Sequence, residues 1–230
     1  MALFDDLKNK ISAYFTEPYS VEKTTIVPST DYSKLTFGNK GLLAEFAFLF
    51  VDIRKSSKLH ENYGYEGAAK IYQSFHDICL RIIEHNEGNV RAFDGDRIMG
   101  VFAGNAKRDN AVKAAMQIRW SVVNILNKKL EKPLSIGCGI DVGQTLVTKI
   151  GKGRNEDTRD LIWIGQACNY ASHLTQEANN SIIISFDVYN RLENKCIFSE
   201  NKNMWNLKNI ELKNKTIIQV CETTYIWVLY

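Results

Sequence analysis

The stretch AEFAFLFVDIRKSS, residues 44–57, joins an apolar run to a polar turn. Apart from Glu45, every residue from Ala44 to Val51 is apolar, which predicts a strand covered on both faces. Asp52 follows this run directly, and a basic, hydroxyl-rich turn follows Asp52. A buried strand does not need a charge at its exit for its own stability. Asp52 is therefore a candidate functional residue.

Strand and helix patterns alternate after this stretch. Two amphipathic helices are indicated by apolar residues at helical spacing, and a turn of Asp and Gly joins two strands into a hairpin. Helices placed between hairpin-joined strands predict an α+β fold, with helices layered on a mainly antiparallel sheet. The expected elements are strand 46–53, helix 64–88, hairpin 89–104, helix 108–130, two short strands about Gly143 within 134–151, a strand entering a helix over 161–178, strand 181–185 and a closing strand pair within 204–230.

The N-terminal region has a different pattern. Leu3, Phe4, Leu7, Ile11 and Phe15 recur at helical spacing and predict a helix over residues 3–15 that packs on its own domain or on a partner subunit. A membrane-surface helix is disfavoured because its polar face mixes Asp with Lys. Residues 16–43 are expected to form an irregular connecting arm. The predicted division is 1–44 for helix and arm and 45–230 for one catalytic domain.

Composition narrows the class of protein. The chain has 230 residues, 45% of them hydrophobic, and a net charge of +3, which is too small to indicate a nucleic-acid-binding protein. Five cysteines without CxxC spacing predict reduced thiols, and no apolar run approaches the ~18 residues of a membrane span. The first residues lack the basic region of a signal peptide. We therefore expect a cytoplasmic protein without a membrane span.

Asp96 lies in the turn of FDGDRIMGVF, between the two hairpin strands. If that hairpin lies beside the strand that ends at Asp52, the two carboxylates converge at one edge of the sheet. Two hard oxygen ligands of this kind suit Mg²⁺ or Mn²⁺ bound with a nucleoside triphosphate. The alternative is that each Asp caps its own turn, which is the favoured interpretation for Asp94. Composition and spacing leave this choice open.

Four segments together resemble the catalytic domain of the class III nucleotidyl cyclases. They are FLFVDIRKSS, RAFDGDRIMGVFAG, IGCGIDVGQTLVTKIG and IWIGQACNYASHL, in the order and spacing of that family. The resemblance covers residues 45–230. It implies a ferredoxin-like α+β fold and a head-to-tail dimer. The implied reaction converts a nucleoside triphosphate to a 3′,5′-cyclic monophosphate and diphosphate.

The resemblance also implies the residues that bind metal and triphosphate. Asp52 and Asp96 match the two metal-binding aspartates, and the carbonyl of Ile53 matches the family's backbone ligand, which implies two Mn²⁺ or Mg²⁺ ions in each site. The turn that follows would bind the triphosphate through its backbone amides. Its residues include Arg54, Ser56 and Ser57.

Asn169 matches the asparagine that orients the ribose in this family. Four residues later His173 stands where an arginine is usual, and the spacing keeps both on one helical face. A histidine is only partly charged near neutral pH and lacks the forked guanidinium. His173 is therefore either a weaker substitute for that arginine, or Arg154 or Arg159 takes its place, or His173 is a helix-surface residue without a catalytic role.

Other positions match the family less closely. Lys213 or Lys215 is the candidate for a triphosphate-binding lysine, although exposed lysines in a turn are common. Lys55, Asp141 and Thr148 depart from the residues usual at their positions, which indicates a divergent branch.

The residues at the two base-reading positions of the purine cyclases are apolar here. They are Ala92 and Ile162, and neither can form a side-chain hydrogen bond with a purine. Phe50, Arg91 and Arg97 are further candidates for contact with the base. The set of motifs resembles the pyrimidine cyclases of Pycsar, a bacterial anti-phage system. That resemblance implies cyclic UMP, or next cyclic CMP, as product, a preference for Mn²⁺, and a separate effector protein that the cyclic nucleotide activates.

Three alternatives remain at this point. One is a purine cyclase, and a second is an inactive cyclase fold kept for dimerisation or nucleotide sensing, which the His173 substitution would favour. The third, a diguanylate cyclase, is disfavoured because the sequence has no GG[DE]EF stretch.

Overall fold

The computed structural model describes residues 3–153, 158–212 and 215–229. A nine-stranded sheet forms its centre, with the order β10-β11-β7-β5-β2-β4-β3, while β1 pairs with β2 and β6 with β5. The pairs are antiparallel except β1 with β2 and β5 with β7. The predicted α+β class with a mainly antiparallel sheet is confirmed. The strands are β1 Ser20–Lys23, β2 Lys40–Ile53, β3 Asn89–Asp94, β4 Arg97–Phe102, β5 Ile136–Ile150, β6 Asp160–Ile164, β7 Ile182–Ser185, β10 Asn206–Glu211 and β11 Ile217–Thr223, with β8 Phe198–Ser199 and β9 Lys202–Asn203 forming a separate pair.

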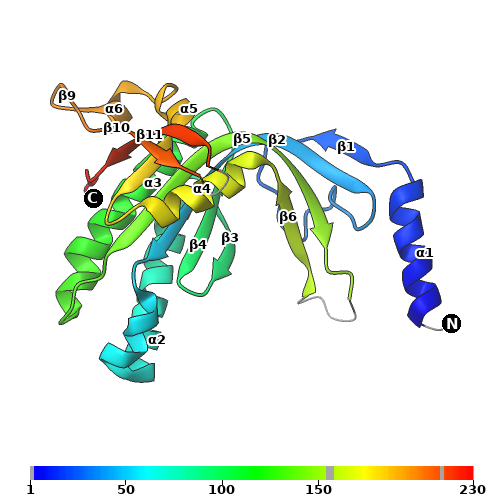
Figure 1. Cartoon of the computed structure of the whole chain (residues 1–230), viewed down its shortest axis with the longest axis horizontal. Helices are drawn as coiled ribbons and strands as arrows, with labels where there is room; N and C mark the ends of the chain where they lie inside the picture. The colour runs from blue at the N-terminus through cyan, green and yellow to red at the C-terminus, as the bar shows by residue number, and fades with distance from the viewer. Residues whose placement is uncertain (1–2, 154–157, 213–214, 230) are drawn as a thin grey trace.

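The helices cover both faces of this sheet. Their bounds are α1 Leu3–Thr16, α2 Leu59–His85, α3 Lys107–Ser121, α4 Gln166–Glu177, α5 Phe186–Tyr189 and α6 Asn194–Ile197. In Figure 1, α2 and α3 lie together at one end, the β5–β6 ribbon extends away from the body, and α1 stands apart at the other end. Among the residues that the structure describes, no helix is long and apolar enough to cross a membrane.

The apolar run of β2 is explained by burial on both faces. Ala47, Leu49 and Val51 pack into the larger core with α2 and α3. Phe46 and Phe48, on the opposite face, pack into a second core that includes α4 residues. The second core lies between α4 and the sheet. The candidate site is built on this face of the sheet, because α4 lies over it.

Two sequence predictions need correction. Residues 136–150 form one strand and not two, and Gly143 pairs with Phe46 within the β2–β5 ladder. A Cβ at Gly143 would lie 3.1 Å from the Cβ of Ala167, so this glycine permits the close approach of α4. Residues 16–43 are less irregular than expected, because they contain β1 and the start of β2, which crosses the predicted boundary at residue 44. Within them Leu35 is only 1% exposed.

Phe75 of α2 provides a test of the larger core. Its side chain is fully buried, so Phe75→Ala is expected to lower the free energy of unfolding by ~3–5 kcal/mol through lost contacts and a cavity. Tyr65 of the same helix is 86% exposed, and Tyr65→Ala should change that free energy by no more than ~0.5 kcal/mol. Urea unfolding followed by circular dichroism measures both. Equal losses for the two variants would contradict the assigned packing of α2.

Candidate active site

Asp52 and Asp96 come together at the end of β2. Asp52 pairs across the ladder with Arg97, the first residue of β4, which places the β3–β4 turn beside it. The backbone N–H of Ile53 donates to the carbonyl of Asp96 at 3.3 Å. The pKa of Asp52 is raised to about 6, first by burial and then by the adjacent Asp96 carboxylate, against the opposing charges of Arg54 and Arg97. The predicted convergence of the two carboxylates is thus found in the structure.

The donors at this point fit a hard divalent cation. Two carboxylates that disfavour each other's charge are stabilised by a cation between them. In the described part of the chain, no group of three or more His, Cys, Asp or Glu side chains is placed to hold a metal ion, so further ligands would be backbone oxygens, such as that of Ile53, or substrate oxygens. Such an all-oxygen set suits Mg²⁺ or Mn²⁺ and not a softer metal.

Two arginines lie against Asp52. The Nη2 atom of Arg54 is 2.9 Å from Asp52 Oδ2, and that of Arg97 is 3.6 Å from the same oxygen. Each guanidinium also contacts α4, since Arg54 donates to the carbonyl of Gln176 at 3.2 Å and Arg97 to Ser172 Oγ at 3.1 Å. These side-chain contacts join the acidic pair to α4. The role predicted for Arg54 concerned its backbone and did not include its ion pair.

The turn after Ile53 has a conformation that brings backbone amides together. Lys55 has φ of 57°, in the left-handed region that favours glycine, and residues 56–58 form one 3₁₀ turn. The Arg54 amide already donates to the carbonyl of Ser135 at 2.8 Å. The amides of residues 55–57, which include Ser56 and Ser57, are therefore the part of this turn left for the predicted phosphate contact.

Helix α4 carries the other predicted catalytic residues. Asn169 is exposed and His173 is partly buried, with its Nε2 atom buried and without a hydrogen bond among the described residues. Ser172, between them on the helix, is the residue that Arg97 contacts. Helix α4 itself contains no Lys or Arg. Arg97 thus brings a guanidinium to the helix on which His173 replaces the usual arginine.

The structure describes only some of the remaining candidate Lys and Arg residues. Arg154 and Lys213 lie outside the described residues. Lys215 lies in the turn between β10 and β11, with φ of 64°. In the order of the sheet, β7 and β5 lie between these strands and β2. Within one chain the structure therefore does not bring Lys215 together with Asp52.

The two predicted base positions lie on different faces of the sheet. Ala92 pairs with Met99, which pairs with Phe50, so all three share the face covered by α4. Ile162 alternates with Trp163 along β6, and it is Trp163 that reaches this face, with its ring 5.7 Å from that of Phe48. The sequence prediction did not name Trp163, although the alternation in LIWIG indicates that residues 162 and 163 face opposite ways.

Arg91 is held by contacts with its own strand and with the N-terminal arm. Its Nη2 atom donates to Asn89 Oδ1 at 3.0 Å and to the carbonyl of Val27 at 3.4 Å. Burial lowers the pKa of Arg91. These contacts tie β3 to the N-terminal arm.

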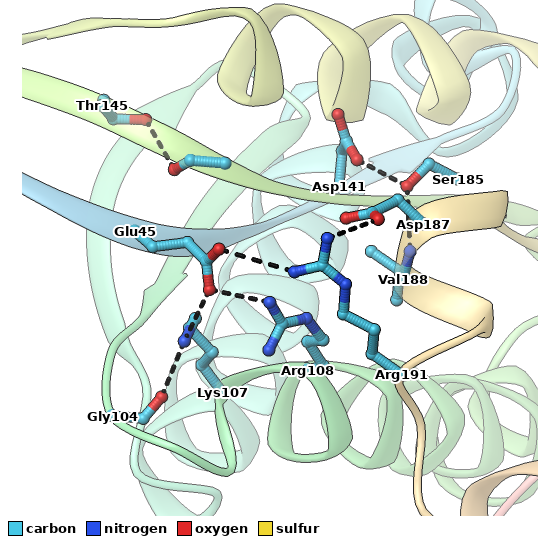
Figure 2. Close-up of polar contacts among 11 residues, drawn as sticks. Glu45, Gly104, Lys107, Arg108, Asp141, Thr145, Ser185, Asp187, Val188 and Arg191 are labelled. Carbon is cyan, nitrogen blue, oxygen red and sulfur yellow. Dashed lines mark hydrogen bonds and ion pairs between the residues drawn. The ribbon is translucent and has the colours of Figure 1, made fainter.

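Figure 2 shows why Glu45 interrupts the apolar run of β2. Its carboxylate lies 2.9 Å from Lys107 Nζ, 2.7 Å from Arg108 Nη2 and 3.7 Å from Arg191 Nη1. Burial alone would raise the pKa of Glu45, but Lys107 and Arg108 lower it below its ordinary value. The network joins β2 to the start of α3 and to the segment after α5. Glu45 therefore has a structural role on the face away from α4.

A second acidic group, Asp141, lies nearby in Figure 2. It is 6% exposed and accepts a hydrogen bond from Ser185 Oγ at 2.5 Å. Burial raises the pKa of Asp141 to about 6, although the Ser185 hydroxyl and the Val142 amide oppose that shift. Since the folded pKa exceeds the unfolded value, the fold favours the protonated form. The stabilisation is full below about pH 4 and is lost as the pH rises through about 6.

Asp141→Asn is expected to remove this pH dependence. Between pH 4.5 and pH 8 the free energy of unfolding of the variant should rise by ~2 kcal/mol relative to that of the wild type, because Asn stays neutral and still accepts from Ser185. Urea unfolding at both pH values measures the difference. Asp77→Asn, an exposed position on α2, should leave the dependence unchanged. A parallel pH profile for Asp141→Asn would contradict the assigned burial of this carboxyl.

Comparison with known proteins supports the same family as the site geometry. No family model matches the chain. The chain is 35% identical over 212 residues to a uridylate cyclase of Burkholderia cepacia, covering 89% of this chain and 91% of that protein. It is 33% identical to a uridylate cyclase of Xanthomonas perforans, covering 89% and 90%.

Solved structures share the fold at lower identity. The guanylyl cyclase Cya2 superposes with a TM-score of 0.68 at 17% identity, covering 83% of this chain and 96% of that one. The adenylyl cyclase CyaB of P. aeruginosa superposes with a TM-score of 0.67 at 21% identity, covering 80% and 95%. Both are cyclase domains, so the ferredoxin-like class III cyclase fold predicted from the motifs is confirmed.

Proposed function

Because this chain belongs to the uridylate cyclase family of class III nucleotidyl cyclases, we propose that it converts UTP to 3′,5′-cyclic UMP and diphosphate. The observation that carries the proposal is the placement of Asp96 beside Asp52 at the edge of the sheet, in a chain 35% identical to a uridylate cyclase. CTP is the next candidate substrate.

The reaction joins the 3′-oxygen of the ribose to the α-phosphorus and breaks the bond from that phosphorus to the β-phosphate. The 3′-hydroxyl loses its proton and diphosphate leaves with the bonding electron pair. Two divalent cations, Mn²⁺ by preference or Mg²⁺, would lower the pKa of that hydroxyl and offset the charge of the departing diphosphate. Asp52, Asp96 and the carbonyl of Ile53 are the groups that would hold them.

The chain's own residues orient the nucleotide. The amides of residues 55–57 bind triphosphate oxygens, and Asn169 positions the ribose. Arg54 and Arg97, which pair with Asp52, are free to turn toward phosphate once cations occupy the acidic pair. Arg97 then supplies the permanent positive charge that His173 does not. Its guanidinium can donate two parallel hydrogen bonds to one phosphate group.

The apolar residues at the two base-reading positions support a pyrimidine base over a purine. Ala92 offers no side-chain donor or acceptor, and Trp163 with Phe48 occupies the same face. Without such a group, adenine or guanine would lack the side-chain partner that reads its edge in the purine cyclases. Ile162 lies on the opposite face and is not placed with Ala92 within one chain.

Two chains are proposed to form each site in a head-to-tail homodimer. The separation of Lys215 from Asp52 within one sheet supports this arrangement, because one chain cannot offer both to a single triphosphate. The resemblance to the Pycsar cyclases supports a further proposal. It is that the enzyme acts in the cytoplasm in anti-phage defence and that its cyclic nucleotide activates a separate effector.

The test is to incubate the purified protein with each of ATP, GTP, CTP and UTP plus Mn²⁺ and to identify products by mass spectrometry. Cyclic UMP should exceed every other cyclic nucleotide. Cyclic AMP or cyclic GMP as the main product would favour the purine cyclase alternative. No product from any substrate would favour a module that binds nucleotide without turnover.

A further inference from the structure

Helix α1 presents an apolar face that the described part of its own chain leaves uncovered. Its six large apolar residues fall within one third of the helix circumference, and none of its residues is buried. A 14-residue helix without tertiary packing is only marginally stable in water. The exposed fractions are 73% for Leu3, 73% for Phe4, 48% for Leu7, 55% for Ile11, 59% for Tyr14 and 87% for Phe15.

The end of α1 is nevertheless fixed to the body. The side-chain amide of Asn39 donates to the carbonyls of Tyr14 at 3.0 Å and Glu17 at 2.8 Å, which satisfies two acceptors at the helix C-terminus. The Tyr19 hydroxyl donates to the carbonyl of Lys40 at 3.0 Å, and β1 then pairs with β2. Helix α1 is thus held as an arm in a set direction (Figure 1).

The C-terminal end of α1 lies beside the β5–β6 ribbon. A cavity of about 350 Å³ lies between them, lined by Tyr14 together with Leu146, Ile150 and Ile164. Ile11, three residues before Tyr14, and Leu7, seven before it, lie on the same side of the helix as Tyr14 and are exposed. We call the space between α1 and the ribbon the α1 groove.

The ribbon contributes a matching apolar wall. Ile162 and Ile164 share one face of β6 and are 41% and 51% exposed, while Ile150 of β5 is 41% exposed. Trp163, on the other face, packs into the second core. Among the described residues, the outer face of the ribbon therefore offers exposed apolar side chains to an amphipathic helix.

We propose that the α1 groove receives helix α1 of a second copy of this chain. Each copy would insert its helix into the groove of the other, as two-fold symmetry requires. The six residues of α1 and the three isoleucines of the ribbon would bury on the order of 900 Å² per copy, comparable with the ~800 Å² per partner of stable interfaces. The inference deepens the proposed function, because it adds an interface to the cyclase dimer beyond the shared sites.

Charge favours a second copy over a membrane surface. The charged residues of α1 are Asp5, Asp6, Lys8 and Lys10, which sum to zero, and Asp6 already pairs with Lys10 at 2.9 Å. Binding of an amphipathic helix to anionic lipid draws on an excess of basic residues, which α1 lacks.

Sedimentation equilibrium of the full chain tests this inference. The double variant Leu7→Asp/Ile11→Asp should raise the dimer dissociation constant about 100-fold or more, because it places charges in the paired faces. Asn9→Asp/Ser12→Asp, on the polar face of the same helix, should leave the constant unchanged. An unchanged constant for the Leu7/Ile11 variant would overturn the inference. So would wild-type co-sedimentation with phosphatidylserine vesicles that the Leu7/Ile11 variant loses, because a membrane would then be the occupant.

Failure of the proposed function would look different. A wild-type chain that makes no cyclic nucleotide, yet dimerises with the dependence on Leu7 and Ile11 described above, would refute the cyclase and leave the interface standing. An active cyclase whose dimer is insensitive to these substitutions would refute the interface alone.

Discussion

Asp52→Asn is expected to reduce cyclic UMP formation by about 10³-fold or more. Asparagine keeps the shape of the side chain and can still accept a hydrogen bond from Arg54, but it removes the charge that binds cations beside Asp96. Product is measured by mass spectrometry at saturating UTP and Mn²⁺. The loss should appear in kcat, because the carboxylate acts on the reacting centre.

Asp94→Asn is the matched control for this variant. Asp94 ends β3, is exposed, and lies two residues from Asp96. Its change should preserve activity, and both variants should unfold at the wild-type temperature. If Asp52→Asn retained more than about a tenth of wild-type activity, the assignment of Asp52 would be wrong.

Two inactive chains are expected to restore activity when mixed. Asp96→Ala removes a cation-binding carboxylate and Asn169→Ala removes the ribose contact, so each homodimer should have no complete site. Random exchange gives mixed dimers in which one of the two sites is intact, or about a quarter of the wild-type activity. The measurement is cyclic UMP formation after co-incubation of equal amounts of the two chains.

The interpretation requires that the mixed chains form dimers. Sedimentation confirms the dimer, and a mixture of Asp96→Ala with Asp52→Asn serves as the control, since both changes affect the same half of the site and cannot complement. Absence of rescue by Asn169→Ala, with dimers present, would mean that one chain supplies the whole site.

The placement of the two aspartates side by side could be predicted from local pattern. The run that ends at Asp52 and the turn that holds Asp96 are both visible in the sequence, and antiparallel pairing of β2 with β4 places their ends together. From the sequence, Glu45 could be identified only as a charged exception in an apolar run. Its structural role could not be predicted, because its partners Lys107, Arg108 and Arg191 come from distant segments.

Other features that depend on contacts between distant segments were missed for the same reason. Gly143 suggested a break between strands, whereas it lies inside β5 where α4 comes close. The pattern of residues 16–43 gave no sign that Leu35 is buried in the second core. The ion pair of Arg54 with Asp52 depends on side-chain direction at a strand end, which spacing alone does not define.

The central claim is that Asp52 and Asp96 together hold divalent cations against a triphosphate. Anomalous diffraction from crystals grown with Mn²⁺ and 3′-deoxy-UTP, which lacks the attacking hydroxyl, tests it directly. The account predicts two manganese peaks ~3.5–4 Å apart that contact both carboxylates and the phosphates. Bound nucleotide with no manganese between Asp52 and Asp96 would contradict it.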